Sequence, residues 1–447
     1  MKPLIDCILI TIFFLNTGIA QTPLSLKAAL QYTVENNAQV QKAEIDIKYG
    51  KSTLKEAVSA GLPQISANAT MLNNLALRTS LIPAEFVGGS PGEFAQLQFG
   101  TNWNGNAGVQ FDQMIFNKQW LLALEGSKKL NDFYDISLVK SKEEVIYETA
   151  KLYYQIQLTE TQRGILIANL EKVNGLHALT DRQYQEGFAK RIDVDRLKVQ
   201  QSNLLTQLNN LNLQIEQLEQ ALKFAMQMPL DTEIELTDTI ALNPLDSNIS
   251  LLQPAYQTRP TLTLLQVQQD LYDLDYRRWR AGHFPTVSLF GNYTYEWQAN
   301  SLGEFTEGIR WTDFSQLGLY INFPIFDGLL KKSRMEMAAY NKLKVAKDFD
   351  YTLLGFQLQH QNAVSSLELN RNNLQAVIET RAVAEDVYRI TEKRYKEGIA
   401  PITELLDAES SMREAQSNYI TTLAQIKLAE IDLMHANGKL IQLIEGQ

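Results

Sequence analysis

Two proline-free stretches of unusual length constrain the fold of this chain more than any other feature. Residues 117–186 and 327–397 each run for about 70 residues without a proline, and a helix of that length extends on the order of 100 Å. Helices far longer than 25 residues are typical of coiled coils, because they must bury an apolar stripe against a partner. The sequence therefore predicts long helices that pack side by side.

A shorter segment with a coiled-coil pattern follows each long stretch. Apolar residues in 190–228 and 401–442 recur at alternating steps of three and four, beginning at Leu204 and Leu405. This spacing is the seam of knobs-into-holes packing. Each long helix is therefore expected to turn back on a shorter one.

A glycine turn joins each long stretch to its shorter partner. Gly187 and Gly398 each follow a tyrosine by three residues and precede an acid by six, the acids being Asp193 and Glu404. Glycine just past a helix end is a stop signal, and Pro401 at the start of the next segment is a start signal. Both segments are predicted to be tight turns between antiparallel helices.

The two turns belong to an internal repeat. Residues 21–228 and 252–442 each predict, in order, a helix, a β-hairpin, a long helix and a returning helix. A connector at 229–251 separates the repeats, and a tail at 443–447 follows them. The hairpins are expected at about 64–113 and 286–324, and the first helices at 24–60 and 252–281.

Apolar and polar residues alternate along the hairpin strands, each of which is about the length that crosses a bilayer when tilted, roughly 9–11 residues. Trp103, Tyr295 and Trp297 near the strand ends suit an interfacial girdle. Four strands cannot close a barrel, and open edges are not tolerated in lipid, so such strands must be pooled between copies. The alternative is an amphipathic hairpin on a soluble core. The apolar face is expected to hold Ile65, Ala67, Ala69 and Met71, then Trp103, Ala107, Val109 and Phe111, then Val287, Leu289, Tyr293, Tyr295 and Trp297, and finally Leu317, Leu319, Ile321 and Phe323.

The first 20 residues have the pattern of a secretory signal. Lys2 precedes an apolar core, and Gly18-Ile-Ala20 supplies small residues before a cut. The only cysteine, Cys7, lies within this segment, so the mature chain is expected to contain no thiol. After this segment the sequence contains no run of about 18 apolar residues, so no transmembrane helix is predicted.

No motif in the sequence predicts an enzyme. The four histidines are scattered without metal-ligand spacing, and phosphate loops, nucleophile elbows and dinucleotide turns are missing from the sequence. We therefore expect no catalytic residues, no cofactor and no metal. The net charge of −10 also argues against a nucleic-acid partner.

Three parts of the sequence carry a family resemblance. They are the run from Leu24 to Asn37, the pair Arg259-Pro260 with the stretch from Arg280 to Leu289, and the stretch from Leu317 to Gly328. In order and spacing they resemble the opening helix, the mid-chain signature and the entry to the second long helix of TolC-type outer-membrane efflux proteins. The resemblance covers essentially all of residues 22–442.

The resemblance implies a mainly α protein with a transmembrane β-barrel part. In this family a long antiparallel coiled-coil α-barrel in the periplasm continues into a trimeric 12-stranded β-barrel, four strands per chain, in the outer membrane. It also implies a homotrimer that contacts outer-membrane lipid, a periplasmic adaptor and an inner-membrane pump. The implied function is a passive exit duct for small molecules such as drugs and toxic compounds.

The resemblance also assigns a role to the repeated turns. It makes them the periplasmic tips, with Glu404 and Asp407 as a ring of acids at the closed aperture and Asp193 and Tyr395 as a link between the two helical hairpins. A simpler explanation of the acids is that they favour the dipole of their helix by ~0.3–1 kcal/mol. The family often has an arginine two residues after the second glycine as partner for the acid of the first hairpin, and this chain departs from that pattern with Ala400.

Two other functions remain open from the residues alone. A duct of the same type could serve type I protein secretion, because the cargo is selected by the pump. A protein of a different class, a secreted soluble coiled-coil scaffold or adhesin, would keep the signal and the heptads but would not need four alternating strands.

Overall fold

The computed structural model describes residues 22–238, 254–305 and 311–445. The predicted signal peptide and residues 239–251 of the predicted connector lie outside this part of the chain. The chain divides into two compact units, which are described separately. Unit 1 contains Met1–Asp46, Asp135–Leu264 and Asp348–Gln447, and unit 2 contains Ile47–Tyr134 and Leu265–Lys347.

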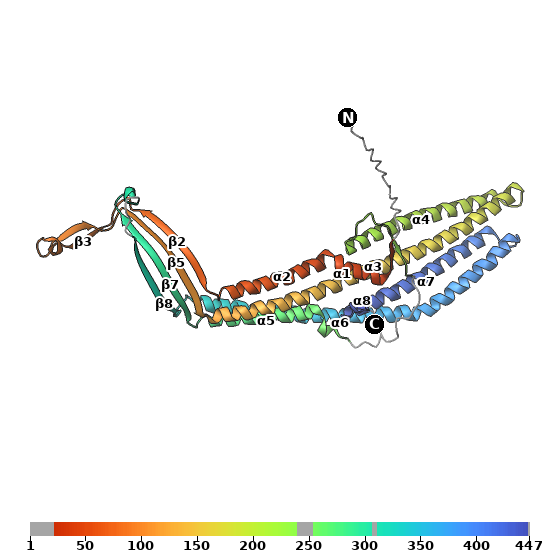
Figure 1. The fold of residues 1–447 in the computed structure, drawn as a ribbon. Helices are drawn as coiled ribbons and strands as arrows, with labels where there is room; N and C mark the ends of the chain where they lie inside the picture. Colours follow the sequence, from red (N-terminus) through yellow and green to blue (C-terminus); the bar gives the residue numbers. More distant parts are fainter. Residues whose placement is uncertain (1–21, 239–253, 306–310, 446–447) are drawn as a thin grey trace, which may run out of the picture. The chain divides into compact units, whose positions relative to one another are not determined.

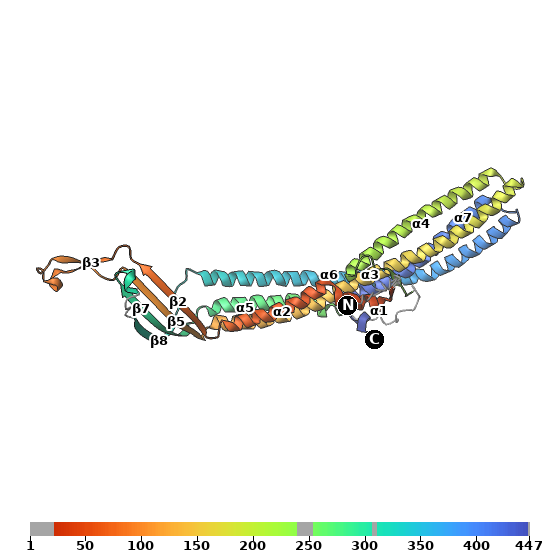
Figure 2. The ribbon, with the colours of Figure 1, turned by 45° about the horizontal axis from the view of Figure 1, so that its top comes forward.

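Unit 1 is built on two helical hairpins. Helix α3 (Lys118–Gln185) is followed by α4 (Arg191–Met226), and α6 (Leu330–Lys396) is followed by α7 (Ile402–Ala436). Figure 2 shows α4 beside α3 and α7 beside α6. These helices lie within a few residues of the predicted ones. None of the helices in the described part of the chain is long and apolar enough to cross a membrane.

The predicted heptad positions form the core between the hairpins. Leu204 and Leu405 are buried in one cluster, to which all four helices contribute. Farther along α7, most of the predicted seam residues, such as Ile426 and Leu433, are also buried. The sequence pattern therefore predicts this packing correctly, because buried apolar stripes hold neighbouring helices together.

A small two-stranded sheet lies beside the middle of α3 and the last residues of α4. Strand β1 (Thr22–Leu24) pairs in parallel with β6 (Ile234–Leu236), and the hydroxyl of Tyr153 donates to the Leu24 carbonyl at 2.9 Å. The alternation in Glu233 to Thr237 is typical of a short strand and agrees with β6, but it indicates no partner. The two strands are separated by more than 200 residues in sequence, so no local pattern indicates that they pair.

The first predicted helix, 24–60, is wrong as a single element. The structure has α1 (Leu26–Asn36) and α2 (Ala38–Ser59), with a break at Asn37. The buried Asn37 side chain donates to the Ala225 carbonyl at 2.7 Å and accepts from the backbone N–H of Gln39 at 2.8 Å. The asparagine thus ends one helix and caps the next, which is a use that this residue type favours.

The other helix predictions also need correction at their ends. Helix α5 (Pro260–Ala281) begins after the short 3-10 helix η3 (Tyr256–Thr258) rather than at 252. Helix α7 ends before Asn437, and α8 (Gln442–Glu445) forms one further short turn. Proline is preorganised for the first position of a helix, which explains the start of α5.

Unit 2 contains a four-stranded antiparallel sheet. Its order is β2, β5, β7, β8, and Figure 1 shows the four strands side by side. The two predicted hairpins therefore join through β5 and β7. The strands span Gln64–Asn73 (β2), Trp103–Phe116 (β5), Thr286–Ala299 (β7) and Thr312–Asn322 (β8).

The register brings the predicted apolar residues of all four strands to one face of this sheet. Ile65 pairs with Phe111, which pairs with Gly291, which in turn pairs with Leu317. Most of these apolar side chains are exposed in the described chain, with Leu317 at 77%. Side chains alternate between faces along a strand, so the next row is polar throughout. It consists of Ser66, Gln110, Asn292 and Gln316.

The sequence missed one structural feature of unit 2. Residues 78–102 are rich in glycine and proline, a composition typical of a loop, but the structure contains two paired strands there, β3 (Thr79–Pro83) and β4 (Phe94–Gln98). The short 3-10 helix η1 (Ala84–Val87) follows β3. Glycines at 88, 92 and 100 have positive φ angles, which is where the chain turns.

Candidate functional site

The two glycine turns of unit 1 have the same backbone geometry. Gly187 and Gly398 have φ angles of 82° and 73°, and each donates its N–H at 3.0 Å to the carbonyl of the tyrosine three residues earlier. A left-handed residue at this point satisfies the last carbonyls of a helix and reverses the chain. Pro401 then directly precedes α7. The two turns therefore match in the way that their shared sequence pattern predicts.

The tyrosines of the two turns have different environments. Tyr395 is 9% exposed, and its hydroxyl lies 2.6 Å from the Thr180 hydroxyl of α3. Burial is the main cause that raises the pKa of Tyr395, and the nearby charge of Asp193 adds to this effect. Tyr184, at the equivalent position of the first turn, is 40% exposed. Only the second tyrosine therefore connects the two hairpins.

Asp193 lies in the first turn of α4, where its carboxylate pairs with Arg196 at 3.6 Å. The structure thus brings Asp193 near Tyr395, but the tyrosine hydroxyl bonds Thr180. From the sequence we expect Asp193 and Tyr395 to link the two hairpins. In the structure Tyr395 makes this link with Thr180, a residue that sequence reasoning missed. Thr180 carried no signal, because a single threonine within a long helix matches no motif.

Glu404 pairs within its own hairpin. Its carboxylate lies 2.8 Å from the guanidinium of Arg394, at the end of α6. Arg394 therefore supplies a positive charge on the second hairpin, although Ala400 stands where the family often has arginine. Asp407, one turn farther along α7, is exposed. Both acids line a groove of about 670 Å³ between α6 and α7.

A second link between the hairpins lies farther from the turns. Glu409 of α7 is 1% exposed and accepts a hydrogen bond from the amide of Gln200 of α4 at 2.8 Å. Arg413 lies 3.5 Å from the same carboxylate and donates to Gln207 of α4 at 3.2 Å. Burial raises the pKa of Glu409, while Arg413 and the bond from Gln200 oppose this rise. Sequence reasoning missed all four residues, which carry no motif.

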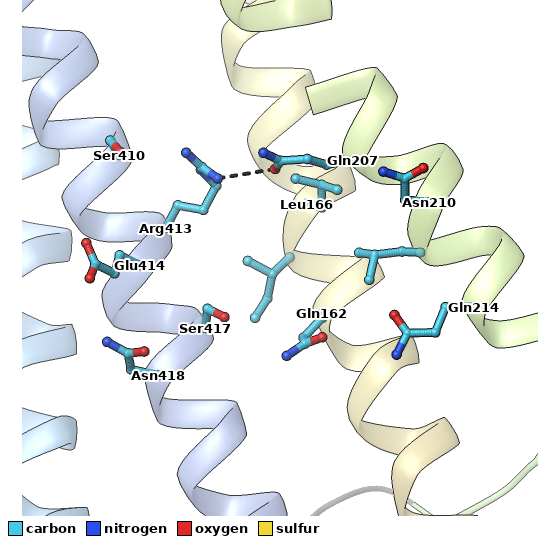
Figure 3. A pocket seen from close by; sticks show the side chains of 12 residues that line it. Gln162, Leu166, Gln207, Asn210, Gln214, Ser410, Arg413, Glu414, Ser417 and Asn418 are labelled. Atoms are coloured by element: carbon cyan, nitrogen blue, oxygen red, sulfur yellow. Dashed lines mark hydrogen bonds between the residues drawn. The ribbon is translucent and has the colours of Figure 1, made fainter. Parts of the chain in front are cut away.

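A polar pocket of about 560 Å³ adjoins this second link. It lies between the α3–α4 hairpin and α7, and Figure 3 shows Arg413 reaching across it to Gln207. Most of its lining side chains are amides and hydroxyls, which favour water. The lining residues are Gln162, Ile165, Leu166, Gln207, Asn210, Leu211, Gln214, Ser410, Arg413, Glu414, Ser417 and Asn418.

The candidate site thus consists of two hairpin ends held together by a small number of polar bonds. Each bond joins α3 or α4 to α6 or α7, so the hairpins cannot separate without breaking them. Hydrogen bonds of this kind contribute about 0.5–1.5 kcal/mol each. Within the described residues no group of three His, Cys, Asp or Glu side chains could hold a metal ion. The arrangement can act as a contact that opens and closes.

Comparison with known proteins points to one family. The family model described as "Outer membrane efflux protein" matches residues 251–439. The outer membrane protein TolC of Escherichia coli is 23% identical over 443 residues, covering 91% of this chain and 83% of that protein. TolC of Vibrio cholerae is 22% identical over 357 residues, covering 75% of this chain and 80% of that protein.

Solved structures have the same fold. The outer membrane protein VceC of Vibrio cholerae has a TM-score of 0.73 at 17% identity, with 92% of this chain and 96% of that chain covered. The CmeC outer membrane channel of Campylobacter jejuni has a TM-score of 0.74 at 16% identity, with 93% and 85% covered. The likeness in fold therefore extends well beyond the segment that the family model matches.

Proposed function

Because residues 251–439 match the outer membrane efflux protein family model and the chain is similar in sequence to TolC over most of its length, we propose that it is the outer-membrane exit channel of a tripartite efflux system. It conducts small molecules passively from a periplasmic adaptor and an inner-membrane pump to the outside of the cell. The pump supplies the energy and selects the cargo. The strands lie in the outer membrane and the helical part lies in the periplasm.

The observation that carries this proposal is the apolar face of the four-stranded sheet. Most of its side chains are exposed in the described chain, and the edge strands β2 and β8 have no further partner among the described residues. Backbone groups in lipid must be hydrogen-bonded, so both edges have to be paired. Three copies, each contributing four strands, form a closed barrel of twelve strands with the apolar face toward lipid.

In this proposal the hairpin ends of unit 1 form the periplasmic gate. The Tyr395–Thr180 bond and the Glu409–Gln200 bond hold the second hairpin against the first in the closed state. Glu404 and Asp407 form the ring of acids at the aperture, where repeated carboxylates repel one another and attract cations. Opening separates the hairpins and widens this ring.

The channel is tested first by location and conductance. The protein is expected in outer-membrane detergent extracts with heat-modifiable mobility, and the purified protein is expected to form cation-selective channels in planar bilayers. Recovery as a soluble periplasmic protein contradicts the proposal and favours the scaffold or adhesin. The matching family model is described as an efflux protein, which favours efflux over type I protein secretion.

The gate is tested by removing its acids. Glu404→Ala combined with Asp407→Ala is expected to raise the single-channel conductance and to weaken cation selectivity. The Glu404–Arg394 pair is exposed, so its loss changes stability by about 0–1 kcal/mol at most. Unchanged conductance in a protein that still forms channels contradicts the role of these acids and leaves the channel itself intact.

A further inference from the structure

The chain between β2 and β5 forms an arm, which we define as residues 74–102. At its base the Asn74 N–H donates to the Asn102 carbonyl at 2.7 Å, and the Asn74 amide donates to the Thr101 carbonyl at 2.9 Å. These bonds extend the β2–β5 ladder by one step. The chain then leaves the sheet, and the β3–β4 ladder continues the hairpin outward.

The end of the arm has a defined structure. The Ala84 N–H donates to the Glu93 carbonyl at 2.8 Å, and the Gly89 N–H donates to the Ala84 carbonyl at 2.8 Å. The Ala84 side chain is buried under this turn, at 6% exposure. The β3–β4 ladder is only five residue pairs long, and an isolated two-stranded hairpin is marginally stable in water. Additional packing is therefore needed to hold the arm in this form.

The surface of the arm is rich in exposed apolar side chains. Phe86 at the end of the arm is 81% exposed and Phe94 is 69% exposed. Monomeric soluble proteins rarely expose such groups together, and clusters of this kind mark contacts with another molecule. The remaining large apolar side chains that are exposed along the arm are Leu75, Leu81, Val87 and Phe99.

The base of the arm adjoins a sheet edge that another copy must cover. Strand β2 is an edge strand, and the arm begins directly after its last residue, Asn73. If the chain forms the proposed channel, β2 pairs with β8 of the next copy, so this step rests on the proposed function. The arm then emerges at the junction of two copies. It lies at the outer mouth, because the other end of β2 leads to α2.

The charges of the arm argue against a lipid headgroup as its partner. Among residues 74–102 there is one basic side chain, Arg78, and there are two acidic ones, Glu85 and Glu93. Surfaces that bind anionic headgroups carry clusters of lysine or arginine. A neutral to slightly acidic arm with exposed phenylalanines is better matched by another apolar protein surface.

We propose that the arm packs against a second copy of this chain at the outer mouth of the barrel, where Phe86, Val87 and Phe94 become buried. The contact supports the short β3–β4 ladder and reinforces the junction between β2 and the neighbouring copy. It also places the arms of the three copies over the mouth, so that they narrow the exit.

Cysteine cross-linking tests the contact directly. The only cysteine, Cys7, lies in the predicted signal, so Phe86→Cys introduces a single thiol into the mature protein. Oxidation of this variant in isolated outer membranes is expected to yield covalently linked copies that a reductant separates. The proposal is overturned if no linked copies form and if brominated lipids quench a fluorescent label on the same cysteine. That result means that the arm contacts lipid instead.

Conductance tests the effect on the exit. Replacement of residues 78–99 by a short glycine-serine turn keeps the base of the arm and is expected to raise single-channel conductance and to lower the temperature at which copies separate. Phe86→Ser with Phe94→Ser is expected to act in the same direction, whereas the matched pair Glu85→Gln with Glu93→Gln is expected to have no effect. A channel that conducts as before in all variants overturns the inference about the arm alone. If the unaltered protein neither associates nor conducts, the proposed function itself fails.

Discussion

At the scale of single residues, the two turns of unit 1 have the same backbone geometry but different side-chain contacts. Tyr395 is buried and bonded to Thr180, whereas its counterpart Tyr184 is 40% exposed. The same turn geometry therefore serves two purposes. One turn only reverses the chain, and the other also holds the hairpins together.

The first prediction concerns the Tyr395 hydroxyl. Tyr395→Phe leaves the buried Thr180 hydroxyl without this partner, which costs roughly 1–3 kcal/mol. The closed state is weakened, so we expect a higher open probability in planar bilayers. Tyr184→Phe is the matched control and is expected to behave as the unaltered protein. Equal behaviour of both variants contradicts a role of the Tyr395 bond in closing the gate.

The second prediction concerns pH and Glu409. Burial raises the pKa of this carboxyl in the folded protein above its ordinary value of 4.5, so the folded state binds the proton more tightly than the unfolded state. Its contribution to stability is therefore greatest at low pH and is lost as pH rises through the folded pKa. Glu143, another buried acid of unit 1, has a pKa shifted in the same direction by burial.

The measurement is the unfolding midpoint in denaturant from about pH 5 to about pH 8. Glu409→Gln mimics the protonated carboxyl, so the midpoint of this variant is expected to fall less with rising pH than that of the unaltered protein. Glu414→Gln, at an exposed position on the same helix, is the control. Parallel pH profiles for Glu409→Gln and the unaltered protein rule out this contribution.

At the scale of elements, the helical seams account for the packing of unit 1. Leu405 is fully buried in the cluster that joins α3, α4, α6 and α7. The small residues that alternate with it along α7 allow the helices to approach closely. The apolar contact therefore holds the hairpins in register, and the polar bonds near the turns add to this contact.

The third prediction tests this apolar contact. Leu405→Ala removes a buried side chain and leaves a cavity, which lowers the free energy of unfolding by about 2–5 kcal/mol. Ile399→Ala, at a position that is 64% exposed, is expected to change it by no more than about 0.5 kcal/mol. Denaturant unfolding of both variants provides the comparison. Similar losses at the two positions mean that the seam does not carry the packing.

At the scale of the whole molecule, the proposed channel depends on which face of the sheet meets lipid. Leu317 and Gln316 are neighbours on β8, and both are exposed in the described chain. Their side chains nevertheless lie on opposite faces, because faces alternate along a strand. In a closed barrel one of them faces lipid and the other faces the water-filled interior.

The fourth prediction uses this pair. Leu317→Arg places a charge on the lipid side and is expected to destabilise the barrel by about 2–4 kcal/mol near the bilayer centre, whereas Gln316→Arg faces the lumen and is tolerated. The fraction of heat-modifiable protein in the outer membrane measures the difference. Equal tolerance of the two arginines contradicts the assignment of the apolar face to lipid.

Features that depend on near neighbours along the chain can be predicted from the amino-acid order alone. Helix length, heptad seams, glycine turns and the alternation of strand faces follow from spacings of two to seven residues, and the structure has them close to the predicted positions. The break at Asn37 was missed because it depends on the Ala225 carbonyl, which is distant in sequence. The β3–β4 ladder was missed because its glycines and prolines favour a loop.

The contacts between residues that are distant in sequence follow from the folded arrangement of the helices and strands. Tyr395 bonds Thr180 across 215 positions of sequence, and Gln200 bonds Glu409 across 209. Strand β5 pairs with β7 of the second repeat as well as with β2 of its own hairpin. Periodicity establishes that two helices share a seam, but it repeats every turn and so leaves the register between them undetermined. Packing of the four helices selects one register, and that choice brings together the residues of the candidate gate.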